Sequence, residues 1–144
     1  MSKAEIGRYL REINEIQSGI LAELESLNCE ELRYSTANAR WNSVRRVMLR
    51  FGDHVREHTT QLIAAREDIG AAPNMPQRLL ACAQEAYGRL LGAMVGLCDE
   101  HLDMAPAEGE WTPREILDHL IATQQSYLEL IRQAHREAQP VDKD

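Results

Sequence analysis

Two histidines, His54 and His58, lie four residues apart. In an α-helix this spacing puts both imidazole rings on one face, about one turn apart. Apolar residues surround the pair at helical spacing, and they are Val47, Phe51, Val55 and Leu62. Both rings are therefore predicted to point into the protein core, where an unpaired polar group is costly. A divalent metal ion would satisfy both rings at once, and His-x-x-x-His on a helix commonly holds one. The alternative is that both rings are partly buried and hydrogen-bonded to water or to carboxylates.

A metal site needs a third ligand, and His119 is the candidate. It lies at the edge of the apolar arc of a later predicted helix, near Ile116 and Thr123. Three neutral imidazoles leave coordination positions open for water or substrate, which is the arrangement of a catalytic rather than a structural site.

Other polar residues near these histidines are weaker candidates. Four carboxylates could orient the rings or could be solvated surface charges: Asp53, Glu57, Glu115 and Asp118. Gln61 could form a hydrogen bond close to a metal-bound water. His101 is predicted to cap a helix end, where a cation is favoured, and His135 to lie on the surface. Of the carboxylates, Glu57 and Glu115 are the least poor candidates for a general base.

Four helical segments are predicted to position these residues, at about 3–27, 43–69, 75–102 and 113–138. Good helix formers dominate the composition and aromatic residues make up only 5%, which favours an all-α protein. Start and stop signals separate the segments. These signals are Ser2 with Glu5, then Asn42 or Ser43, Gly70 with Pro73, Asn74 with Pro76, and Thr112 with Pro113 and Glu115.

A polar loop followed by a tryptophan and a helix occurs twice, at Trp41 and at Trp111. This repetition predicts two pseudo-symmetric helical hairpins that pack as one four-helix bundle, a single domain over residues 1–144. Each tryptophan is predicted to close one end of the bundle rather than to stack on a ligand.

Charge and composition exclude several classes of partner. The net charge is −7 and no basic run could follow a phosphate backbone, so nucleic acid is not expected as a partner. No stretch is long and apolar enough to span a membrane. The three cysteines lie far apart and form no CxxC pair, which is typical of a reducing cytoplasm, and the protein is expected there.

Two segments resemble the signatures of a known family. Residues 53–62, DHVREHTTQL, resemble the histidine helix of the DinB/YfiT-like metalloenzyme superfamily. Residues 111–120, WTPREILDHL, look like that superfamily's single-histidine signature. The resemblance implies a four-helix bundle that binds a divalent ion through His54, His58 and His119. In the usual members the single-histidine helix comes first, whereas here the order of the two motifs is reversed.

The family includes thiol transferases that use bacillithiol and isomerases that use mycothiol. The resemblance therefore implies a zinc, nickel or manganese ion, a small-molecule substrate and a low-molecular-weight thiol, in a metal-dependent transferase or hydrolase. The ion would act as a Lewis acid on a bound thiol or water. The competing hypothesis is a non-catalytic bundle that binds a partner or serves in a stress response, with a vestigial or structural metal site. A homodimer is compatible with either hypothesis.

Overall fold

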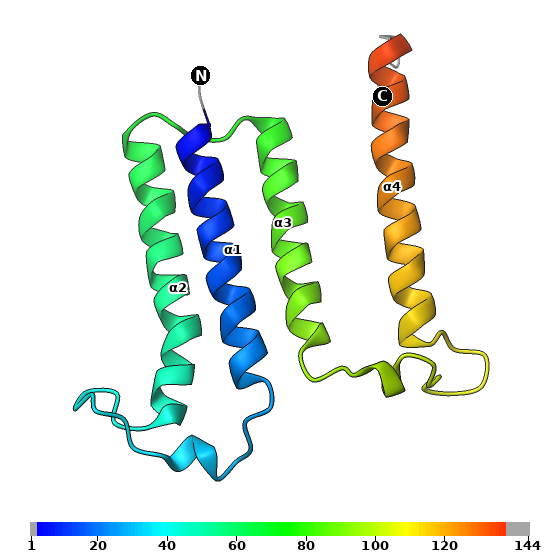
Figure 1. Ribbon diagram of the computed structural model, residues 1–144. Coiled ribbons are helices and arrows are strands. Elements are labelled where there is room, and N and C mark those ends of the chain that lie inside the picture. Colours follow the sequence, from blue (N-terminus) through cyan, green and yellow to red (C-terminus); the bar gives the residue numbers. More distant parts are fainter. Residues whose placement is uncertain (1–2, 138–144) are drawn as a thin grey trace. The chain divides into compact units, whose positions relative to one another are not determined.

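The computed structural model describes residues 3–137, and every regular element in this range is helical (Figure 1). The elements are α1 (Ala4–Leu24), η1 (Glu31–Arg33), α2 (Val44–Asp68), α3 (Met75–Met94), η2 (Asp99–His101) and α4 (Pro113–Glu137). The predicted all-α class with four helices is confirmed. The chain divides into two compact units, Met1–Val95 with the first three helices and Gly96–Asp144 with α4. The prediction that they form one domain stays a prediction.

In the first unit, α2 lies alongside α1, because residues of both helices line one pocket. The connection between them contains η1 and a hydrogen-bonded loop that closes on the start of α2. Ser35 and Ser43 form an isolated antiparallel bridge, and the amide of Val44 donates to the carbonyl of Tyr34 at 3.0 Å. These bonds hold the residues between the two serines next to the first turns of α2.

Side-chain caps define the helix starts as the sequence predicts. Ser43 is extended and its hydroxyl accepts the amide of Arg46. Asn74 and Gln77 form a reciprocal capping box at the start of α3. Each of these bonds satisfies an amide that has no partner inside its helix. For α1, the predicted cap Ser2 lies outside the described residues, and Lys3 forms no side-chain cap bond.

Two helices end earlier than the sequence pattern predicts. The third helix was expected to reach residue 102, but it ends at Met94, and Gly96 follows with φ of +79°. Leu97 continues the apolar spacing of the helix, which conceals this break in the sequence. The first helix ends at Leu24 instead of residue 27, although the amide of Leu27 still bonds to the carbonyl of Leu24 at 3.1 Å.

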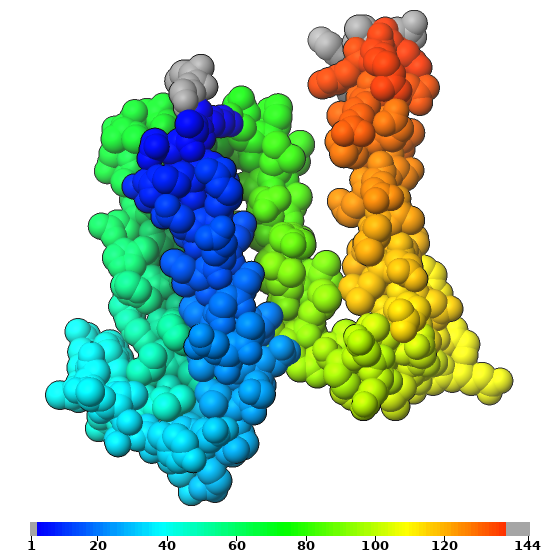
Figure 2. Space-filling view, viewed as in Figure 1, coloured from blue at the N-terminus to red at the C-terminus, as the bar shows by residue number. Residues whose placement is uncertain are grey.

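The apolar stripes of the helices remain accessible. No residue described between 3 and 137 is buried, and large apolar side chains such as Ile16 and Leu62 are 60% and 69% exposed. The space-filling view shows side chains at the surface along each helix (Figure 2). Among these residues, no helix is both long and apolar enough to cross a membrane.

The cap of α4 generates a stability prediction. The hydroxyl of Thr112 accepts the amide of Glu115 at 3.2 Å, and the Glu115 carboxylate accepts the amide of Thr112 at 2.8 Å. Thr112→Ala should lower the free energy of unfolding by about 1 kcal/mol, because it leaves a helix amide without its acceptor. Urea denaturation followed by circular dichroism measures this loss. Thr112→Ser is the control and should retain most of the stability; equal stability of the alanine variant would contradict the cap assignment.

Candidate metal centre

The two histidines of α2 meet through their outer ring nitrogens. His54 Nε2 and His58 Nε2 lie 2.9 Å apart, and the rings stand edge to face at a centroid distance of 4.4 Å. The helical spacing of four residues produces this meeting, as the sequence predicts. The structure therefore brings together two of the three predicted metal ligands.

Gln61 fixes the protonation pattern of this pair. His58 Nδ1 lies 2.8 Å from Gln61 Oε1, and an amide oxygen only accepts hydrogen bonds. The proton of neutral His58 is therefore on Nδ1, which leaves the Nε2 lone pair free. Without a ligand, the Nε2 proton of His54 donates to that lone pair. Sequence analysis placed Gln61 near a metal-bound water; its direct partner is the ring of His58.

The donor set fits one divalent ion shared by both rings. At metal–nitrogen bonds of about 2.0–2.1 Å, two ligands of a tetrahedral ion lie roughly 3.3 Å apart. Adjacent ligands of an octahedral ion with bonds of that length lie roughly 3.0 Å apart. The observed separation of 2.9 Å is close to both values. The Gln61 bond at the opposite nitrogen is also the usual support of a metal-bound histidine.

The two α2 histidines are more exposed than the sequence pattern predicts. Both rings are exposed, whereas the sequence pattern placed them in a buried core. The reason is that the apolar residues around them are themselves accessible; Val55 is 57% exposed. His54 nevertheless lines a pocket of about 380 Å³ with Ile16 and Ile20 of α1. The helical spacing predicted that both rings lie on one face of α2, but it could not predict how far that face is buried.

The carboxylates next to the two α2 histidines in the sequence form ion pairs with arginines. Glu57 forms a two-pronged ion pair with Arg50 at 2.7 and 2.6 Å, and Asp53 pairs with Arg56 at 2.9 Å. The hydrogen bonds from Arg50 lower the pKa of Glu57 below its ordinary value. Glu57 is therefore ionised but weakly basic at neutral pH, which makes it a poor general base.

His119 belongs to the second unit. Its Nε2 lies 3.4 Å from the hydroxyl of Thr123, and its ring meets the edge of Trp111 at a centroid distance of 5.0 Å. Within residues 3–137, no group of three or more metal-ligating side chains is assembled. The role of His119 as the third ligand stays a prediction. The predicted base Glu115 takes part in the α4 cap.

The two remaining histidines belong to the second unit. His101 ends η2 and forms a capping box with Cys98, whose amide donates to His101 Nδ1 at 3.3 Å and whose Sγ lies 3.1 Å from the same atom. The prediction placed His101 at the C-terminal end of the third helix, where a cation is favoured. That helix ends at Met94, and His101 instead accepts an amide at the start of η2. His135 lies in the last turn of α4.

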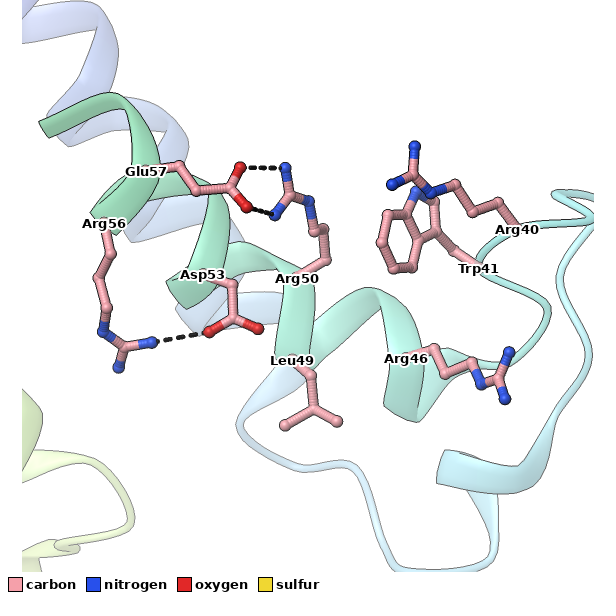
Figure 3. A pocket seen from close by; sticks show the side chains of 8 residues that line it. All are labelled: Arg40, Trp41, Arg46, Leu49, Arg50, Asp53, Arg56 and Glu57. Atoms are coloured by element: carbon pink, nitrogen blue, oxygen red, sulfur yellow. Dashed lines mark hydrogen bonds and ion pairs between the residues drawn. The ribbon is translucent and has the colours of Figure 1, made fainter. Parts of the chain in front are cut away.

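Sequence analysis missed a second pocket, at the start of α2. It is lined by Arg40, Trp41, Arg46, Leu49, Arg50, Asp53, Arg56 and Glu57 (Figure 3). The available signal was local: five arginines lie between positions 40 and 56 of an otherwise acidic chain. That signal was overlooked because these arginines are interrupted by other residues and form no continuous basic run.

Comparison with known proteins supports the resemblance in part of the chain. Residues 83–144 match the sequence profile of the DinB superfamily. This segment includes His119 and excludes the α2 histidines. No curated protein and no solved structure matches the chain. The reversed order of the histidine motifs stays a prediction.

The Arg50–Glu57 pair predicts a measurable titration. In a carboxyl-detected NMR titration, the pKa of Glu57 should lie below its ordinary value of 4.5, and Arg50→Gln should return it towards that value. Because the folded-state pKa is lowered, the pair stabilises the protein at neutral pH, and this contribution is lost as pH falls through the lowered pKa. Arg56→Gln, which removes the neighbouring pair, is the control. An unchanged Glu57 pKa in Arg50→Gln would contradict the assignment.

Proposed function

We propose that this chain binds a divalent metal ion through His54, His58 and His119; the match of residues 83–144 to the DinB superfamily supports the proposal. The observation that carries the proposal is the 2.9 Å approach of the two Nε2 atoms on α2, with Gln61 on the far side of the His58 ring. The third ligand rests on the resemblance of residues 111–120 to the family's single-histidine signature. Zinc, nickel and manganese are the candidate ions; imidazole ligands suit zinc and nickel, whereas manganese favours oxygen ligands.

The function that we propose is metal-dependent chemistry on a small molecule, of the thiol-dependent transferase kind found in this family. A divalent ion in the site would supply a Lewis acid that generates a nucleophile from a thiol or water at neutral pH. The protein's own contribution is to orient the rings: Gln61 holds His58 in the tautomer that exposes Nε2. The charge of Glu57 is already balanced by Arg50, so it does not compete with His58 for a cation.

Metal content tests the proposal directly. Wild-type protein reloaded with zinc, nickel or manganese should retain one ion per chain, measured by elemental analysis after removal of free metal. His58→Ala should lose it, because one of the two proposed Nε2 ligands on α2 is gone. Gln61→Leu should weaken binding about tenfold or more, since the partner that orients a ligating ring typically contributes that much.

His135→Ala is the matched control, because it removes an imidazole in the last turn of α4 that is not a proposed ligand. It should bind metal like the wild type. Metal-free wild-type protein after reloading would refute the proposal, as would equal metal content in the His58→Ala variant.

The thiol requirement has its own test. A low-molecular-weight thiol that binds the metal-loaded protein should raise its thermal midpoint, because ligands that bind only the folded state stabilise it. The measurement is a thermal-shift series with several thiols, and the control is the His58→Ala variant, which should hold no metal and show no shift. If no thiol shifts the midpoint of the wild type, the thiol-dependent version of the function is excluded, whatever the metal content.

A further inference from the structure

The pocket at the start of α2 combines arginines with an aromatic ring. Its volume is about 480 Å³, and all eight lining residues lie between positions 40 and 57. Figure 3 shows the Arg40 guanidinium over the Trp41 ring and the Arg46 side chain below the ring, with Arg50 and Glu57 to its left. The pocket is therefore built by one helix and the loop that closes on it.

The charges in this pocket do not cancel. Two carboxylates, Asp53 and Glu57, face four guanidinium groups, which leaves a formal charge of +2 in a chain whose net charge is −7. Arg50 and Arg56 are the arginines bonded to those carboxylates. For Arg40 and Arg46, no ion pair with a carboxylate is found in the described part of the chain. These two guanidinium groups keep their hydrogen-bond donors available for an anion.

The loop fixes the indole that forms the apolar wall. The hydroxyl of Thr36 donates to the carbonyl of Trp41, and the amide of Trp41 donates to Asn38 Oδ1 at 3.0 Å. The guanidinium carbons of Arg40 and Arg50 lie 4.8 and 5.5 Å from the ring centroid of Trp41, within the range of cation–π attraction. Trp41 thereby keeps two cations beside an aromatic surface.

We propose that this pocket binds a small organic anion, one that carries a phosphate or carboxylate group on a planar or apolar body. The donors of Arg40 and Arg46 would take the anionic group, and Trp41 with the exposed side chain of Leu49 would contact the body. The volume suits a small molecule rather than a polymer. The inference goes beyond the proposed metal function, because none of the three proposed ligands lines this pocket.

The experiment uses the full chain freed of metal and dialysed into a buffer without multivalent anions. Phenyl phosphate is titrated while the indole N–H signals are followed in proton–nitrogen NMR spectra. The Trp41 signal should shift in a saturable way, whereas the Trp111 signal should stay in place and serves as the internal control. Trp111→Phe assigns the two signals. Failure of the Trp41 signal to shift would overturn the proposal.

Variants test whether the arginines carry the binding. The double variant Arg40→Gln with Arg46→Gln should bind phenyl phosphate about tenfold more weakly, since it removes both sets of charge-assisted hydrogen bonds. The single variant Arg46→Gln is compared with Arg45→Gln, which removes one charge from the same helix but does not line the pocket and should change the affinity by less than about twofold. Equal losses in both variants would overturn the proposal, because they would show a general effect of charge.

Three further probes identify what the pocket recognises. Benzoate tests a carboxylate, inorganic phosphate tests the anion without a ring, and phenol tests the ring without charge. Saturable binding of phenyl phosphate or benzoate, tighter than that of phenol, supports the proposal. Phenol binding as tightly as phenyl phosphate would overturn it, because the arginines would then contribute nothing. All arms use metal-free protein, so a failure here is distinct from a failure of metal binding.

Discussion

The loop of residues 34–44 is hydrogen-bonded back to the start of α2, and the arginine pocket of the first unit depends on this loop conformation. The amide of Thr36 donates to the carbonyl of Asn42 at 3.2 Å, and this bond and the Ser35–Ser43 bridge return the chain to the helix. The same closure gives Ser43 the extended backbone of a helix cap. One set of local bonds thus starts α2, seats Trp41 beside it and keeps the arginines next to an aromatic ring. None of this requires a buried core.

Helix geometry then distributes the chemistry of α2 over different faces. Residues four apart bring His54 to His58, whereas residues seven apart, two turns along, bring Arg50 to Glu57. The first pairing brings together the two Nε2 atoms proposed as metal ligands, and the second holds a carboxylate in an ion pair with Arg50. Because Arg50 holds Glu57 by two hydrogen bonds, this carboxylate belongs to the arginine pocket rather than to the histidine pair.

Features that depend on hydrogen bonds between residues close in the sequence could be predicted from the sequence. The caps at Ser43, Asn74 and Thr112 were predictable because each needs only a side chain and an amide three residues on. The end of α3 was not, because a left-handed backbone at Gly96 interrupts a continuous apolar spacing. The meeting of the two α2 histidines followed from spacing alone. Their exposure and the arginine pocket depend on loop conformation and packing, which residue spacing does not encode.

Two residues connect the separate parts of this surface. Trp41 and Arg50 line both the cationic pocket and the neighbouring pocket that contains His54. The second pocket is mostly apolar, with Val47, Phe51 and Val55 on α2. A molecule anchored by its anionic group at the free arginines could therefore extend past the indole towards the imidazole. Trp41 forms a wall of both pockets. The loop that positions Trp41 would therefore set the distance between the anionic group of a bound molecule and the ring of His54.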